Sequence, residues 1–145
     1  MSKVVARESA PVKAAPERVL QFLRDYREGR QRILTDNYTA YRVEQGGKGE
    51  GTVYAYHFTA GGRERDYRLH VHEREDGLEE HDQMSSFMSI WTVLPASGGS
   101  TVTIEASWDG AGGIGGFFER RFAPAGLRRI YAQVLSHLQD ALAVD

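Results

Sequence analysis

Apolar and polar residues alternate through the middle of the chain, with a period of two that is typical of half-buried β-strands. A first such segment covers residues 4–14. Turn signals, among them Gly46-Gly47, Gly61-Gly62, Asp76-Gly77 and Gly98-Gly99, then separate six more, over residues 37–45, 51–60, 63–74, 78–85, 86–96 and 100–108. Short loops of this kind join antiparallel neighbours. The pattern predicts seven strands, most of them in an antiparallel meander.

Helical spacing interrupts this pattern after the first strand and returns at the end of the chain. Pro16 and Glu17 suit the first turn of a helix over residues 16–26, and a second short helix is predicted over 27–34. In the last segment, apolar residues recur at spacings of three and four: Leu127, Ile130, Tyr131, Val134, Leu135, Leu138 and Leu142. This spacing predicts one long helix with a single apolar face. Pro124 should kink this helix or mark its start.

Composition narrows the classes of protein. The 145 residues predict a single domain over 1–145, and a net charge of −2 gives no reason to expect a nucleic-acid partner. The arginines at 27, 30 and 32 should lie on a solvated helix face. The absence of cysteine excludes disulfides and thiolate chemistry, and fits a cytoplasmic protein. We expect no signal peptide in MSKVVARESA, and no apolar run reaches the roughly 20 residues of a membrane helix.

A glycine-rich segment, WDGAGGIGGFFERRF (residues 108–122), contains a literal G-x-G-x-x-G at Gly110, Gly112 and Gly115. A dinucleotide site needs the following helix to lead to a second, parallel strand. The predicted helix instead runs to the end of the sequence, so we expect no nucleotide binding. The remaining interpretations are a plain connector with core phenylalanines, or a loop that helps to close a cavity.

The order strand, two short helices, six-strand meander and long helix resembles the helix-grip fold of the START-related, pollen-allergen-like and polyketide cyclase/dehydrase (SRPBCC) superfamily, and its small bacterial members above all. The similarity covers the whole chain. It rests on APVKAAPERVLQFLRD, GKGEGTVYAYHF and AGLRRIYAQVLSHLQDAL. The resemblance implies an α+β fold in which a seven-stranded antiparallel sheet wraps around the C-terminal helix. It further implies an apolar cavity between sheet and helix, which the glycine-rich loop helps to gate.

Strand alternation and the resemblance together predict which side chains line that cavity. Tyr54, Tyr56 and Phe58 share one face of their strand, and the resemblance implies that this face is the inner one. Phe87, Ser89 and Trp91 are expected to point inward as well. The predicted ligand-binding residues are Tyr54, Tyr56, Phe58, Tyr67, Leu69, Trp91, Phe118, Leu127, Ile130 and Tyr131. A stripe of Tyr and Phe also suits an ordinary filled core, which is the alternative interpretation.

Candidate catalytic and metal-binding groups are few. His70 and His72 share a strand face, as metal ligands would, but this face lies opposite Leu69, so we expect both to be exposed and free of metal. No G-x-S-x-G places a serine as nucleophile. Alternation also predicts no arginine or carboxylate inside the cavity, so catalytic residues cannot be named. Tyr54, Tyr56 and Tyr67 would be the acid–base candidates of an enzyme.

Three functions remain open. The first is a cofactor-free, cytoplasmic protein that binds a small hydrophobic ligand, lipid-like or polyketide-like, without stable membrane insertion. The second is a cofactor-free polyketide aromatase/cyclase or dehydratase. The third is a protein-interaction module of the co-chaperone type, which a filled core would favour. The sequence leaves the ligand and the oligomeric state undetermined.

Overall fold

A computed structural model describes residues 3–109 and 124–143. Seven strands account for most of the first range: β1 (Lys3–Val12), β2 (Tyr38–Gln45), β3 (Val53–Ala60), β4 (Arg63–Arg74), β5 (Gly77–Asp82), β6 (Met88–Ala96) and β7 (Gly99–Asp109). The described helices are α1 (Pro16–Leu23), α2 (Gly29–Arg32) and α4 (Pro124–Ala143). The predicted order of elements is confirmed, with the first two helices shorter than the sequence pattern suggested.

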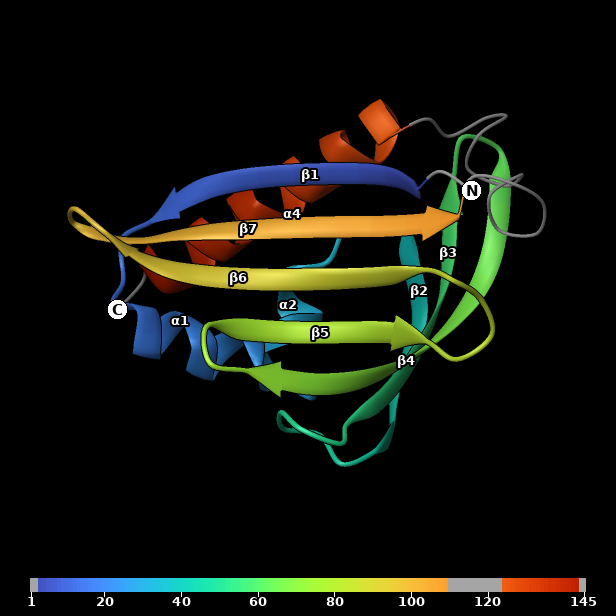
Figure 1. Ribbon diagram of the computed structural model, residues 1–145, viewed down its shortest axis with the longest axis horizontal. Coiled ribbons are helices and arrows are strands. Elements are labelled where there is room, and N and C mark those ends of the chain that lie inside the picture. Colours follow the sequence, from blue (N-terminus) through green and yellow to red (C-terminus); the bar gives the residue numbers. More distant parts are fainter. Residues whose placement is uncertain (1–2, 110–123, 144–145) are drawn as a thin grey trace.

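The strands form one antiparallel sheet in the order β1-β7-β6-β5-β4-β3-β2. Consecutive strands from β2 to β7 are neighbours, and β1 joins the far edge beside β7. The sheet is strongly curved: β2 and β3 at one end run across the direction of β1, β7 and β6 at the other (Figure 1). At β2 the curvature coincides with a register shift between Thr39 and Arg42, where Ala40 has a φ of 53°. Such a bulge bends a strand and increases its twist.

The long helix α4 lies on the concave side of the sheet, behind β1 and β7 in Figure 1. Its buried residues are the predicted ones: Leu127, Ile130, Tyr131, Val134, Leu135, Leu138 and Leu142. Helices α1 and α2 also lie on the concave side of the sheet, behind the level of β5 and β6 in the view of Figure 1. Gly29 allows α2 to approach α1 closely, since a Cβ atom there would collide with the carbonyl oxygen of Phe22.

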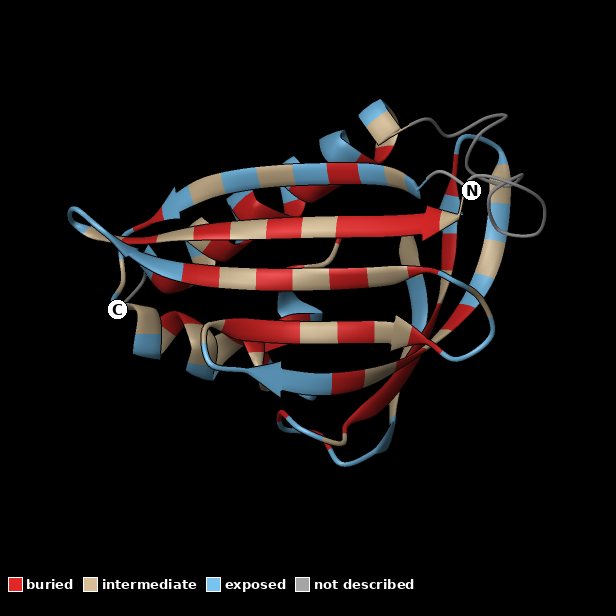
Figure 2. Ribbon diagram, in the orientation of Figure 1, coloured by how far each residue is buried: buried red, intermediate tan, exposed pale blue. Residues whose placement is uncertain are grey.

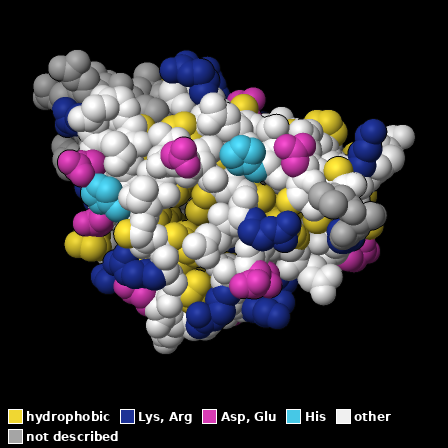
Figure 3. Space-filling view, turned by 180° about the vertical axis from the view of Figure 1, so that it is seen from behind, with side chains coloured by type: hydrophobic (Ala, Val, Ile, Leu, Met, Phe, Trp, Pro, Cys, Tyr) yellow, Lys and Arg dark blue, Asp and Glu magenta, His cyan; other side chains and the backbone are white. Residues whose placement is uncertain are grey.

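Burial alternates along the strands as the sequence predicted, most clearly on β4, β6 and β7 (Figure 2). On β4, Tyr67, Leu69 and Val71 are buried, whereas His72 is exposed. Figure 3 shows the molecule from behind, and on this face positively and negatively charged side chains are interspersed. Among the described helices, none combines the length and the hydropathy needed to cross a bilayer.

Candidate functional site

The inner face of the sheet carries a continuous group of aromatic side chains at the β2–β3–β4 end. Tyr54, Tyr56 and Phe58 are buried on β3, as the strand phase predicted. Tyr67 of β4 is paired with Tyr56 in the ladder, and the centroids of the two rings lie 5.4 Å apart. Tyr38 of β2 meets the Tyr56 ring edge-on at a centroid distance of 4.9 Å. Because each ring is fixed by its neighbours, these side chains form an ordered wall.

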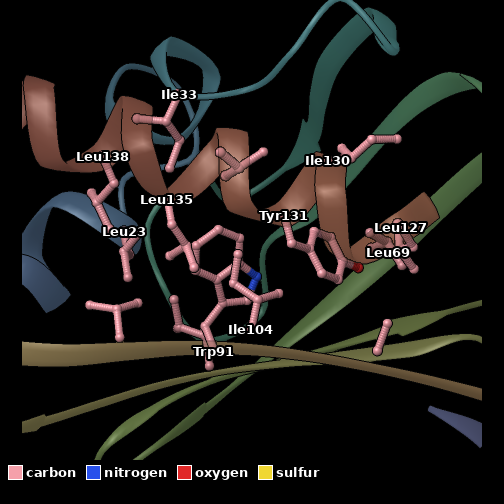
Figure 4. Close-up of a cluster of buried hydrophobic side chains, with 14 of the residues drawn as sticks. Leu23, Ile33, Leu69, Trp91, Ile104, Leu127, Ile130, Tyr131, Leu135 and Leu138 are labelled. Atoms are coloured by element: carbon pink, nitrogen blue, oxygen red, sulfur yellow. The ribbon is translucent and has the colours of Figure 1, made fainter. Parts of the chain in front are cut away.

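Helix α4 supplies the opposite wall. Leu127, Ile130 and Tyr131 of this helix are buried. In Figure 4 the Tyr131 ring points away from α4, with its hydroxyl on the side of Leu127 and Leu69. The structure buries every predicted ligand-binding residue in the described ranges: Tyr54, Tyr56, Phe58, Tyr67, Leu69, Trp91, Leu127, Ile130 and Tyr131. Phe118 lies outside the described residues. Burial fits both a ligand site and a core, so contact with a ligand stays a prediction.

Two adjoining spaces remain between these walls. One, of about 10 Å³, is bordered by Phe58, Tyr67 and Leu127. The other, of about 20 Å³, is bordered by Arg30, Glu80 and Trp91. Both are also bordered by the same four aromatic residues: Tyr38, Tyr56, Phe87 and Tyr131. Each space has room for about one water molecule, so the residues that border these two spaces leave little free volume between them.

The second space ends at a buried ion pair. Arg30 comes from α2 and Glu80 from β5, and the guanidinium Nη2 donates to the carboxylate Oε2. Each residue is 1% exposed. The guanidinium carbon lies 4.5 Å from the ring centroid of Tyr26 and 4.1 Å from that of Trp91. Aromatic faces on both sides therefore hold the cation in place.

Hydroxyl groups complete the coordination of the carboxylate. Tyr54 donates to Oε1 of Glu80 over 2.5 Å, and Ser89 donates to the same oxygen over 3.2 Å. Tyr26 donates to Oε2 over 2.5 Å. Together with Arg30, four side chains thus donate to Glu80. These hydrogen bonds and the ion pair offset the hydration that the buried carboxylate loses.

Burial and the ion pair also set the protonation states. Burial, together with the nearby Glu80 charge, raises the pKa of the Tyr54 hydroxyl well above its usual value. Burial likewise raises the pKa of Tyr56, Tyr67 and Tyr131. For Arg30, burial is the largest influence and opposes the charged form, but Glu80, Tyr26 and Tyr54 together outweigh it and raise the pKa. At neutral pH the site therefore holds protonated phenols and a charged guanidinium.

Two donors at the site have no hydrogen-bond partner among the described residues: Nε of Arg30 and the hydroxyl of Tyr67. Each belongs to a side chain that borders one of the two spaces. A buried donor without an acceptor costs about 1–3 kcal/mol. Both atoms are fully covered, so an oxygen of a ligand or a water molecule would reach them after a movement of the neighbouring side chains.

Comparison with known proteins identifies the family. The sequence model of the family described as polyketide cyclase/dehydrase and lipid transport matches residues 3–143. The chain belongs to this polyketide cyclase/dehydrase family. A search of curated proteins returns no significant match.

Solved structures agree with this assignment. KanY protein (ms6282) is 40% identical, with a TM-score of 0.89 and 99% of each chain covered. TTHA0849 from Thermus thermophilus is 19% identical, with a TM-score of 0.75 and 99% of each chain covered. Major latex-like protein 151 from Panax ginseng is 11% identical, with a TM-score of 0.71, and the match covers 97% of this chain and 96% of that one. The last two show similarity of fold alone, and the helix-grip fold is confirmed.

Within this cyclase/dehydrase fold, the ion pair overturns two sequence-based predictions. Alternation was expected to leave no arginine or carboxylate inside, and Arg30 was expected on a solvated face. The structure buries both Arg30 and Glu80. Alternation on β5 places Leu78 and Glu80 on the inner face, and the apolar Leu78 was a usable signal. For Arg30 no signal existed, because a four-residue helix has too few positions to show a buried face.

The other candidate groups do not join the site of this family member. His72 is exposed, and its Nδ1 lies 3.2 Å from Oε2 of Glu50 on the outer side of the sheet. His70 is half-buried on the same face, with its ring centroid 4.6 Å from that of His72. In the described parts of the chain, no group of three or more His, Cys, Asp or Glu side chains is arranged to hold a metal. The glycine motif of residues 110–115 lies outside the described residues, so neither interpretation of it is tested.

Proposed function

We propose that the protein binds a small hydrophobic ligand between the sheet and α4, at the aromatic end of the interior. The observation that carries the proposal is the pair of spaces bordered by the same four aromatic side chains, one of which also adjoins Tyr67 and the other the buried Arg30–Glu80 pair. Ligand sites are mostly apolar and contain a few placed polar groups. The family description, which includes lipid transport, supports the same assignment.

The ligand-contacting residues in this proposal are those predicted from the sequence, with Arg30 added. Because these two spaces together hold about two water molecules, a ligand occupies them when the aromatic side chains between them move. Tyr38, Tyr56, Phe87 and Tyr131 border both spaces, so movement of these side chains would join the two. We further propose that binding needs no cofactor and takes place in the cytoplasm.

Native mass spectrometry of the purified protein, together with titration of an apolar fluorescent probe, tests this function. We expect a co-purifying small molecule or saturable probe binding at one site per chain. A protein that carries nothing and binds no apolar probe would refute ligand binding. That outcome would favour the co-chaperone alternative, for which a nearly filled interior is the expected structure.

An enzymatic role is the second candidate, and the buried Arg30–Glu80 pair favours it. In a cyclase or dehydratase reaction of a polyketide-like chain, a carbon–carbon bond forms between an enolised carbon and a carbonyl carbon, and a water molecule then leaves. Arg30 would hold the carbonyl oxygen. The Tyr67 phenol would donate a proton to the departing hydroxyl, and the resulting phenolate would take the proton that the neighbouring α-carbon loses, which restores the phenol. Glu80 would position Arg30, because its oxygens already accept four hydrogen bonds.

Incubation with a poly-β-ketone thioester distinguishes the two roles. An enzyme should convert it faster than buffer does to a product with aromatic absorbance, and Tyr67→Phe should slow the conversion without preventing binding. Binding without conversion in the parent protein would leave the ligand-binding role alone.

A further inference from the structure

The outer face of the sheet has two contrasting halves. On β3, β4 and β5 it is lined with ion pairs, among them His57–Asp66 and Arg74–Glu79. On β1, β7 and β6, which lie in front of α4 in Figure 1, most outward side chains are uncharged. We call this second half the neutral face. It comprises the outward side chains of residues 5–11 on β1, 101–107 on β7 and 88–94 on β6.

Apolar side chains are accessible on the neutral face. Val5 and Leu94 are 45% and 48% exposed, and they are two of the three large hydrophobic residues that are exposed in the described ranges. Met88 and Ile90 of β6 are partly exposed. The charged residues of this face, Arg7 and Glu105, pair with each other, with 3.7 Å between Nε and Oε1. The face therefore has no net charge and presents apolar surface of the kind that marks contacts between proteins.

The composition of the neutral face favours a second copy of this chain as the partner. A membrane surface is recognised by Trp and Tyr or by an excess of Lys and Arg, and the outward residues of this face provide neither. A face with one cation and one anion can meet a copy of itself without net repulsion. Two sheets also pack well face to face, about 10 Å apart and with their strands aligned within about 30°.

The register of the strands defines a self-complementary arrangement. The ladder places Glu105 beside Ile90 in one row, and Thr103 beside Thr92 in the next row. A two-fold axis that runs across the strands between these rows sets each residue of one row against the other row of the second copy. Glu105 then faces a threonine hydroxyl, and Ile90 faces the methyl group of Thr92. No like charges are brought together.

We infer that the neutral face is the contact surface of a homodimer, in which two copies pack face to face about this axis. The face spans about 20 Å along the strands and about 10 Å across them, or roughly 500 Å² with the reach of its side chains. Two copies would bury roughly 1,000 Å², at the lower limit of specific interfaces, so we expect a dissociation constant of about 10–100 µM. The inference concerns the outer face alone and is independent of ligand binding in the interior.

Sedimentation equilibrium between about 10 µM and about 1 mM tests the inference, and the parent protein should form a reversible dimer. Leu94→Arg should weaken this dimer at least about tenfold, because Leu94 faces Met88 of the second copy and an arginine there would be buried without an anion. Met84→Arg is the matched control, because Met84 is 70% exposed in the connection between β5 and β6, outside the neutral face. It should leave the dissociation constant unchanged. A parent protein that stays monomeric up to about 1 mM, or a dimer that Leu94→Arg does not weaken, would contradict the inference.

Chemical cross-linking tests the orientation of the two copies. The sequence contains no cysteine, so a single introduced thiol is the only one in each chain. Thr92→Cys lies beside the proposed axis, and a bismaleimide with a spacer of about 10 Å should link two such chains. Thr59→Cys, exposed on the outer side of β3 in the charged half, is the matched control and should remain unlinked. Equal linking of the two variants would show that any dimer uses another surface.

Discussion

The two ends of the interior are built from different residues. Around the C-terminal half of α4, aliphatic side chains such as Leu23, Ile33, Leu135 and Leu138 are buried in one core cluster with Ile104 (Figure 4). Around its N-terminal half, rings predominate, an ion pair is buried, and two donors lack partners among the described residues. An aliphatic core is stabilised by apolar burial and packing alone. The aromatic end contains polar groups whose burial is costly and whose presence packing alone does not explain.

From this difference we infer that the aliphatic end chiefly stabilises the fold and that the aromatic end binds the ligand. Substitutions at the aliphatic end should reduce the free energy of unfolding and leave binding unchanged. Substitutions at the aromatic end should alter binding, and those in the ion pair should alter both.

The largest effect is expected from Arg30→Met. This change leaves Glu80 charged and buried without its cation, and removing one partner of such a pair typically costs about 3–5 kcal/mol. Adding Glu80→Gln should recover at least half of the loss, because no unpaired charge then remains. Arg32→Met, on the same helix but exposed, is the matched control and should stay within about 0.5 kcal/mol. Urea denaturation measures all three, and equal effects at Arg30 and Arg32 would contradict the structural account.

Leu138→Ala should have the next largest effect. Leu138 is fully buried at the aliphatic end, and truncation of such a leucine costs about 2–5 kcal/mol. Binding of an apolar probe to the folded variant should match that of the parent protein. A probe affinity that falls in parallel with stability would show that the two ends are not separate.

Alkaline pH should destabilise the protein through the phenols of the aromatic end. Burial raises the pKa of the hydroxyls of all seven tyrosines above the ordinary value of 10.0. The folded state then keeps protons that the unfolded chain releases, so stability is fully present below about pH 10 and falls as the pH rises further. Each phenol contributes up to about 1.4 kcal/mol per pH unit. Tyr67→Phe should reduce this slope by about that amount in denaturation curves between about pH 9 and 12, and an unchanged slope would argue against burial of the Tyr67 hydroxyl.

Most of the fold could be predicted from the sequence, because its signals are periodic. Alternation located all seven strands, and the apolar spacing of Leu127 to Leu142 located α4 and its buried face. The aromatic wall followed from the same alternation once the inner face of β3 was assigned. The polar half of the site did not follow. Glu80 and Arg30 meet across 50 residues of sequence, and no local pattern indicates that two opposite charges will be buried together.

The smallest effect is expected on the outer face of the sheet. His70 and His72 lie on the side of β4 away from Leu69 and contribute nothing to the interior. Replacing both with alanine should change stability by no more than about 0.5 kcal/mol. Stoichiometric metal in the purified protein that disappears in the double variant would overturn this expectation.

The most direct test of the central claim, that the aromatic end is a ligand site, is to measure stability and binding together at Tyr56, which borders both spaces. Truncating an aromatic residue in a filled core costs about 3–5 kcal/mol. We expect Tyr56→Ala to cost less, because the far side of its ring adjoins free space, and to alter the affinity for an apolar fluorescent probe. Tyr56→Trp, which adds bulk, should weaken probe binding. A loss of about 3–5 kcal/mol in Tyr56→Ala, with no probe binding in the parent protein, would contradict the claim and leave a filled core.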